Sequence, residues 1–188
     1  MKKILIFCFL VLVFSCPGIG QTKNLPPFDK SAMDMSYYPD KYPVLKIQGK
    51  ATEPLVSRIV YSRPVKAGRI IFGNLVKYGE VWRLGANEAT EIEFYRHVKI
   101  GGKKIAKGRY TLYTIPEENS WTFILNKETD TWGSFKYDAQ KDVIRVNVAV
   151  QKLSTSTEYL TMVFEKTISG CKLVVIWDNV KTELPVYF

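Results

Sequence analysis

The sequence is poor in the residues from which most catalytic and metal centres are built. It has one histidine, His97, and three cysteines, of which Cys8 and Cys16 lie within the first twenty residues. A zinc site that needs several histidine ligands is therefore excluded. If the first twenty residues are removed as a signal peptide, for which the evidence follows below, only Cys171 remains and no internal disulfide can form. No serine has the flanking glycines of a nucleophile elbow. We therefore predict no catalytic residue, no metal and no cofactor.

The remaining histidine and cysteine have the settings of structural residues. His97 falls between Arg96 and Val98, in a run with the alternation of a strand. Cys171 begins an apolar run that ends at Trp177, and a lone cysteine there is expected to be a small buried hydrophobe and not a nucleophile.

The chain also lacks an apolar run of the roughly 20 residues that a transmembrane helix needs. Lys2 and Lys3 are followed by an apolar stretch from Ile4 to Phe14, which ends before Pro17. A short basic segment, an apolar core and then small residues form a secretory signal. We expect residues 1–20 to be a signal peptide, and the exported protein to be periplasmic or extracellular without a membrane span.

Two processing sites compete at the end of this segment. Gly18 and Gly20 occupy the positions of small residues before a cleavage site, which gives Gln21 as the mature N-terminus. The alternative is a lipoprotein box from Val13 to Cys16, in which Cys16 carries the lipid.

Basic residues exceed acidic ones, but they are scattered. Removal of Lys2 and Lys3 takes the basic count from 27 to 25 against 18 acidic residues, which leaves a net charge of +7. No basic cluster reaches five residues, so nucleic acid is not an expected partner. For an exported protein the charge suits acidic polysaccharides or anionic lipid headgroups, or simply a soluble surface. Nothing indicates which protein partner the chain has.

Apolar and polar residues alternate from about residue 44 to the end. Residues 21–43 carry four prolines and few periodic apolar positions, which predicts an extended leader before a single domain over residues 44–188. Alternation with a period of two predicts half-buried strands. The strand runs are Ile92 to Ile100, Tyr110 to Ile115, Trp121 to Leu125, Val146 to Val150, Leu160 to Phe164 and Leu173 to Trp177.

Turn signals every 10 to 15 residues separate these runs, among them Ser169-Gly170 and Asp178-Asn179. Residues 154–157 are expected to form a loop, and residues 73–78 are the one candidate for a helical turn. The pattern predicts an all-β fold with very little helix, an antiparallel β-sandwich of which the jelly roll is one form.

The segment from Tyr78 to Thr90 breaks the strand alternation and gathers polar, glycine and aromatic residues. Gly85 permits a positive φ. In one interpretation this is a ligand-binding loop, with Trp82 as a stacking platform and Arg83 as a fork for a carboxylate or phosphate. In the other it is a buried polar knot, in which Arg83 pairs with Glu88 and Asn87 satisfies turn amides. The candidate residues from this loop are Trp82, Arg83, Asn87, Glu88 and Thr90.

Further candidates lie outside this loop. Trp132 and Tyr137 provide flat faces for sugar rings, or else cover a sheet edge. Arg145 is a second candidate cation for an anionic ligand. Glu88 and Asp142 form the acid and base of a glycoside hydrolase if they meet at one end of a sandwich, but Asp142 is more simply a residue at the entry to a strand.

Several ordered motifs make the sequence similar to a known family. They include residues 61–64, 66–73, 81–90, 108–116 and 142–146. Over residues 31–188 the chain resembles the uncharacterised bacterial family called domain of unknown function 2911. The resemblance implies an exported protein of a kind common in the Bacteroidetes, without an established activity.

Three hypotheses about function follow. The first is a noncatalytic envelope or extracellular domain that binds a small anionic or carbohydrate ligand at the loop of residues 82–90. The second is a structural or protein-interaction module whose polar loop is buried. The third is a hydrolase that uses the paired carboxylates.

Overall fold

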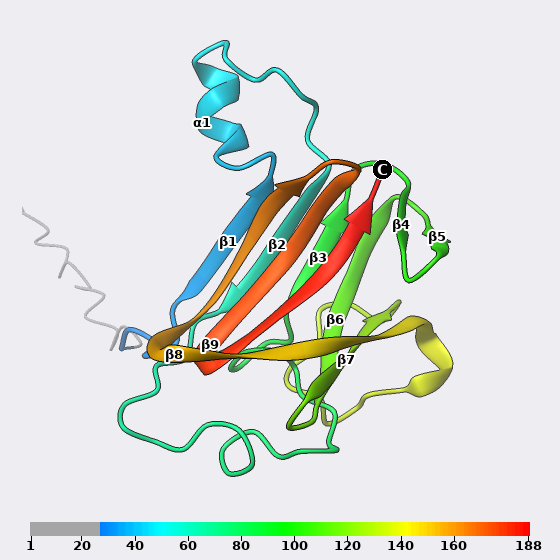
Figure 1. The fold of residues 1–188 in the computed structure, drawn as a ribbon. Helices are drawn as coiled ribbons and strands as arrows, with labels where there is room; N and C mark the ends of the chain where they lie inside the picture. The colour runs from blue at the N-terminus through cyan, green and yellow to red at the C-terminus, as the bar shows by residue number, and fades with distance from the viewer. Residues whose placement is uncertain (1–26) are drawn as a thin grey trace, which may run out of the picture.

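A computed structural model describes residues 27–188, which form one antiparallel sheet with a small amount of helix (Figure 1). The expected signal peptide and the first residues of the expected leader lie outside the described residues. The strands are β1 (Met33–Tyr38), β2 (Ser57–Ser62), β3 (Glu91–Phe94), β4 (Val98–Ile100), β5 (Lys103–Ile105), β6 (Gly108–Pro116), β7 (Ser120–Asn126), β8 (Asp142–Thr167) and β9 (Gly170–Tyr187). The helices are α1 (Tyr42–Ile47) and the short 3-10 helix η1 (Ala139–Lys141).

The nine strands follow the order β1-β2-β3-β6-β7-β8-β9-β4-β5. Strand β8 connects two parts of this sheet, because its first half pairs with β7 and its second half pairs with β9. In Figure 1 the second half of β8 and all of β9 lie in front of β1, β2 and β3. The prediction of an all-β fold with very little helix is therefore confirmed. Two separate sheets, as in a sandwich or jelly roll, are not confirmed, since all nine strands belong to one hydrogen-bonded sheet.

Two irregularities let β8 and β9 change direction together. The register between them shifts after Lys152 and again after Thr157, and Asp178 on β9 has a left-handed φ of 52°. The Asp178 carboxylate accepts hydrogen bonds from Lys66 Nζ at 2.7 Å and from Ser156 Oγ at 2.8 Å. β-Bulges bend and twist a strand pair in this way.

The core lies between the two parts of the sheet and is rich in aromatic side chains. Trp121 and Trp177 are almost completely buried, and Phe72 contacts both rings. Hydrogen bonds also join the parts, since Tyr61 on β2 accepts a hydrogen bond at its hydroxyl from the Met162 amide of β8 at 3.0 Å. Burial of many large rings supplies the apolar area that a domain without disulfides needs.

Several local predictions were wrong in detail. Part of the expected leader is strand β1, and the short helix α1 follows it with Pro43 in its first turn. Residues 73–78 form turns and not a helical turn, and residues 154–157 lie within β8. His97 lies in the connection between β3 and β4. A strand with a bulge tolerates turn-forming residues, so local composition misplaces such positions.

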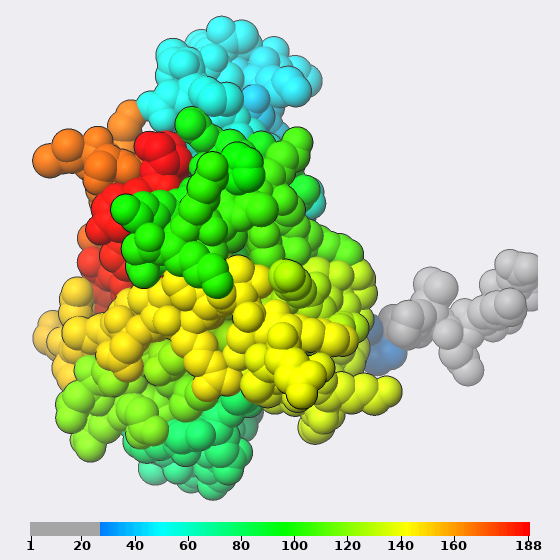
Figure 2. Space-filling view, turned by 90° about the vertical axis from the view of Figure 1, so that its right-hand side faces the viewer, coloured from blue at the N-terminus to red at the C-terminus, as the bar shows by residue number. Residues whose placement is uncertain are grey.

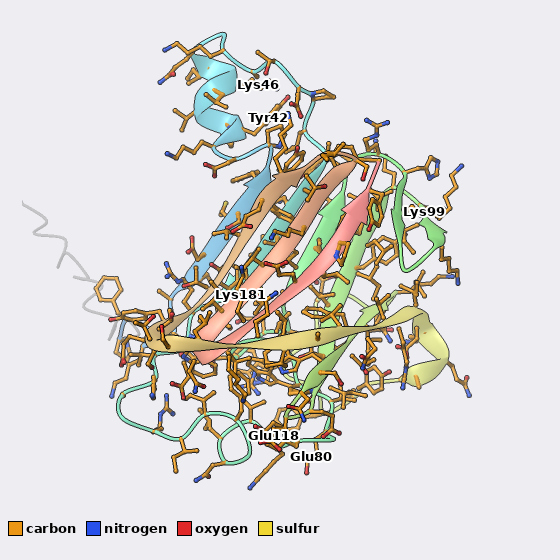
Figure 3. All side chains as sticks on the ribbon, viewed as in Figure 1. Tyr42, Lys46, Glu80, Lys99, Glu118 and Lys181 are labelled. Carbon is orange, nitrogen blue, oxygen red and sulfur yellow. The ribbon has the colours of Figure 1, made fainter. Side chains whose placement is uncertain are left out.

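No helix in residues 27–188 is both long enough and apolar enough to cross a membrane. Figure 3 places Tyr42 and Lys46 on α1, at the opposite end of the molecule from Glu80 and Glu118.

Residue Cys171 is buried, as expected, and its burial raises the pKa of the thiol to about 12. A thiol with this pKa stays protonated and unreactive near neutral pH.

Candidate functional site

The loop of residues 82–90 lies in the long connection between β2 and β3 and is fixed to β6. Trp82 exchanges two backbone hydrogen bonds with Thr114, at 2.7 and 2.9 Å. At the other end, the Leu112 amide donates to the Thr90 carbonyl at 2.8 Å, and the Thr90 hydroxyl donates to the Leu84 carbonyl at 2.7 Å. Thr90 therefore closes the loop from inside and does not face a ligand.

Trp82 belongs to the core, so its interpretation as a solvent-facing platform was wrong. Its side chain is 8% exposed, and its ring stacks on Trp177 with centroids 6.0 Å apart and an interplanar angle of 18°. The indole Nε1 donates to the Gly85 carbonyl at 3.2 Å. Burial of the indole ring is energetically favourable, and its polar Nε1 atom has a hydrogen-bond partner. Trp82 therefore fixes the base of the loop to the core.

Gly85 is required for close packing and not for a positive φ. The left-handed residues of the loop are Leu84, with φ 55°, and Asn87, with φ 58°. A Cβ atom on Gly85 would stand 3.2 Å from the Ser62 carbonyl oxygen. The absence of a side chain lets the loop lie directly against the end of β2.

Arg83 projects from this fixed backbone into a small pocket of about 170 Å³. Its Nε atom is buried and has no hydrogen-bond acceptor among residues 27–188. Burial alone lowers the pKa of Arg83. The buried knot predicted an ion pair between Arg83 and Glu88, but no such pair forms.

A second arginine lines the same pocket. Arg69 donates from Nε to the Lys66 carbonyl at 3.0 Å and from Nη2 to the Val65 carbonyl. The described residues place no carboxylate in an ion pair with Arg69 or Arg83, and the pocket lining contains no aspartate or glutamate. We call this hollow the arginine pocket; the lining residues that matter here are Ser31, Arg69, Trp82, Arg83, Gly85 and Trp177.

Asn87 and Glu88 point away from the arginine pocket. Asn87 Nδ2 donates to Asp29 Oδ2 at 2.6 Å, which ties the loop to the segment before β1. Glu88 is exposed and lines a different hollow, of about 180 Å³, together with Glu91 and Asp130. The five predicted loop residues therefore do not form one site.

The two carboxylates of the hydrolase hypothesis line no common pocket. Asp142 Oδ2 accepts hydrogen bonds from Tyr137 at 2.5 Å and from Arg145 Nε at 2.8 Å, and its Oδ1 accepts one from Asn126 at 2.8 Å. Asp142 is thus saturated with donors, which is the arrangement of a structural carboxylate. The same bonds hold Arg145, a candidate ligand residue, against its own strand.

Trp132 lies in the connection between β7 and β8, at a hollow of about 520 Å³. It is 61% exposed, and Phe135 beside it is 84% exposed. The Gly133 amide donates to the Asn87 carbonyl at 2.9 Å, so this connection is attached to the loop of residues 82–90. Tyr137, by contrast, packs edge-on against Tyr113 with centroids 5.2 Å apart.

A family model described as "Protein of unknown function (DUF2911)" matches residues 45–186. The chain belongs to the DUF2911 family. A search of curated proteins and a search of solved structures found no significant match. The matched range contains both arginines of the arginine pocket, whereas β1 and Ser31 precede it.

Sequence reasoning missed three features of this DUF2911 protein. Arg69 follows a turn and carries no local signal that it would meet Arg83. Phe135 has no sequence signal that distinguishes it from the other aromatic residues. The third is an open hollow of about 550 Å³ beside the β4–β5 hairpin, where His97, Lys99 and Lys104 line the surface. Figure 3 marks Lys99 on that hairpin.

No group of three or more histidine, cysteine, aspartate or glutamate side chains suited to a metal occurs within residues 27–188.

Proposed function

We propose that this DUF2911 protein is an exported, noncatalytic domain that binds a small anion at the arginine pocket. The observation that carries the proposal is Arg83, whose buried Nε atom has no acceptor within residues 27–188. A buried donor without a partner costs about 1–3 kcal/mol. A carboxylate, sulfate or phosphate group in the pocket would give the Arg83 guanidinium an acceptor that the described residues do not provide.

The neighbouring residues support the same class of ligand. Arg69 adds a second guanidinium, and the two side chains together offer planar donor sets that match carboxylate and phosphate oxygens. Ser31 adds a hydroxyl at the rim. The lining holds no carboxylate that would compete with an anionic ligand, although Arg69 already donates from Nε and Nη2 to the Lys66 and Val65 carbonyls.

The size of the pocket limits what it can take. Its volume of about 170 Å³ corresponds to roughly six water molecules at about 30 Å³ each. That space suits one anionic group, either as a free ion or as the charged end of a larger molecule such as a uronic acid. An arginine stays protonated at neutral pH and cannot act as a general acid or base there, so the pocket suits binding and not catalysis.

Export is proposed from the sequence of the first twenty residues, with Lys2 and Lys3 before the apolar run. Expression of the full chain, cell fractionation and mass spectrometry of the purified protein test it. A mature chain that begins at Gln21 supports signal cleavage, and a lipidated Cys16 supports the lipoprotein alternative. A chain that keeps Met1 and stays in the cytoplasm contradicts export.

The binding experiment is isothermal titration calorimetry with protein purified after expression of the full chain. Sulfate, phosphate, acetate and galacturonate are the probes, and glucose is the uncharged control. We expect saturable binding of at least one anion. The Arg83→Met variant should weaken it by at least about tenfold, which corresponds to about 1.4 kcal/mol.

The matched control is Arg96→Met, since Arg96 is exposed and lies outside the arginine pocket. Its affinity for the anion should equal that of the unmodified protein. The proposal is wrong if no anion binds, or if Arg83→Met and Arg96→Met lose affinity equally. The first of these outcomes would favour a structural or protein-interaction module.

A further inference from the structure

A second hollow, separate from the arginine pocket, is formed by the connection from β7 to β8. Its volume is about 520 Å³, and its lining includes Trp132, Phe135, Lys136, Lys141, Glu128 and Thr131. We propose that this hollow, here called the aromatic pocket, binds an uncharged saccharide whose rings stack on Trp132 and Phe135. This proposal does not depend on the arginine pocket.

The two aromatic rings are exposed although the backbone that carries them is fixed. Trp132 is 61% exposed and Phe135 is 84% exposed. The Gly133 amide donates to the Asn87 carbonyl at 2.9 Å, and Ser134 Oγ donates to the Val81 carbonyl at 2.9 Å. The connection is therefore attached at both residues between the rings, and it presents them to solvent.

Gly133 explains how the second ring is placed. Its φ is 67°, and the position that a Cβ atom would take is 2.7 Å from an atom of the Phe135 ring. Only a residue without a side chain allows the ring to lie so close to the backbone. Phe135 thus packs on its own turn and leaves its other face free.

The polar groups around the rings suit an uncharged ligand. Lys141 forms an ion pair with Glu128, and Asp130 forms one with Arg109. Thr131 Oγ1 is hydrogen bonded to the Tyr113 hydroxyl at 3.0 Å. These pairs cancel the charges of Glu128, Asp130 and Lys141, so that Lys136 is the one charged lining residue without an ion pair among residues 27–188. The paired groups keep both donors and acceptors at the surface, which is what sugar hydroxyl groups need.

This composition differs from that of the arginine pocket, where cations occur without carboxylates. It also differs from a flat protein-binding patch, because the rings border a hollow. Its volume is within the range of roughly 300–1,000 Å³ typical of ligand pockets. Figure 2 views a face on which the connection before β8 and the first half of β8, both in yellow, cross the molecule below the β4–β5 hairpin in green.

The test is calorimetric titration of protein purified after expression of the full chain. The probes are uncharged tetrasaccharides of glucose, xylose and N-acetylglucosamine, with tetragalacturonate as an anionic comparison. We expect at least one uncharged tetrasaccharide to bind. Trp132→Ala should reduce its affinity by at least about tenfold, and Trp132→Phe, which keeps a flat ring, should lose less than Trp132→Ala.

The matched control is Phe28→Ala, since Phe28 is fully exposed and lies outside the aromatic pocket. It should bind the saccharide as the unmodified protein does, and circular dichroism should show all variants folded. The proposal is overturned if no uncharged tetrasaccharide binds at millimolar concentration, or if Phe28→Ala weakens binding as much as Trp132→Ala.

The two proposals fail separately. Binding of tetragalacturonate alone, lost in Arg83→Met and kept in Trp132→Ala, would support the arginine pocket and overturn the saccharide site. Binding of an uncharged tetrasaccharide that survives Arg83→Met would support the saccharide site whatever the arginine pocket does. Capture of a protein on the Trp132 surface without saccharide binding would also overturn it.

Discussion

Arg83 combines a charge, partial burial and a donor atom without an acceptor in the described part of the chain. Its replacement by methionine keeps most of the side-chain volume and removes that charge. We expect Arg83→Met to raise the free energy of unfolding by about 1 kcal/mol in buffer without the bound anion. Urea unfolding measures this change.

The comparison is with Arg96→Met, whose exposed side chain should change stability by no more than about 0.5 kcal/mol. Addition of a binding anion stabilises only the protein that keeps Arg83, so the difference should shrink or reverse. A destabilised Arg83→Met in anion-free buffer would mean that the guanidinium makes net favourable contacts within the protein.

Trp82 and Trp132 test the distinction between a core tryptophan and an exposed one. Trp82 is 8% exposed and stacks on Trp177, while Trp132 is 61% exposed. Trp82→Ala should therefore cost about 3–5 kcal/mol of stability, because it leaves a cavity. Trp132→Ala should cost no more than about 0.5 kcal/mol. Equal losses in chemical denaturation would contradict these assignments.

At the scale of elements, the β8–β9 hairpin unites the molecule, because it pairs with β7 and, through β9, with β4. Gly170 begins β9 with a φ of 154°, and a Cβ atom there would stand 2.2 Å from the Val186 carbonyl oxygen. That neighbour is backbone and cannot rotate away. Gly170→Ala should therefore push the last residues of β9 away from its first residue.

We expect Gly170→Ala to lower the free energy of unfolding by at least about 3 kcal/mol, near the upper part of the usual range for single substitutions. Gly102→Ala is the matched control, since Gly102 has a φ of 81° but no atom near its added Cβ. Its cost should be limited to about 1 kcal/mol of backbone strain. Thermal unfolding of both variants checks the contrast, and a Gly170→Ala protein as stable as Gly102→Ala would disprove it.

At the scale of the whole molecule, several buried groups hold their protons in the folded state. Burial raises the pKa of Cys171 from 9.0 to about 12. Burial, aided by hydrogen bonds to Glu93 and Asp142, raises the pKa values of Tyr95 and Tyr137 from 10.0 to about 12. Between pH 9 and 12 the unfolded chain therefore releases protons that the folded protein keeps.

Stability should thus be constant with respect to these groups below pH 9 and fall as the pH rises toward 12. Each group contributes a slope of at most about 1.4 kcal/mol per pH unit. Cys171→Ala should flatten the fall between pH 9 and 10, where the unfolded thiol titrates before the tyrosines. Denaturant unfolding at several pH values measures the slope, and an unchanged slope in Cys171→Ala would show that the thiol is not responsible.

The all-β class of the fold could be predicted from the sequence, because the alternation of each strand is a local pattern. Alternation with a period of two is a property of each strand, so the runs at Tyr110 to Ile115 and Trp121 to Leu125 predicted β6 and β7. The turn signal at Ser169-Gly170 likewise predicted the turn between β8 and β9. The family also followed from ordered motifs, and Cys171 was buried as its apolar neighbours predicted.

Which side chains contact one another could not be predicted in the same way, because these contacts depend on how distant segments pack in the folded chain. Trp82 and Arg83 are adjacent in the sequence and both border the arginine pocket, yet Trp82 is packed in the core and forms the base of the pocket, whereas Arg83 is only partly buried. Arg69 reaches the same pocket through the turns after β2. Whether Arg69 and Arg83 line one pocket depends on the path of the long β2–β3 connection over the folded sheet, and no local sequence pattern predicts that path.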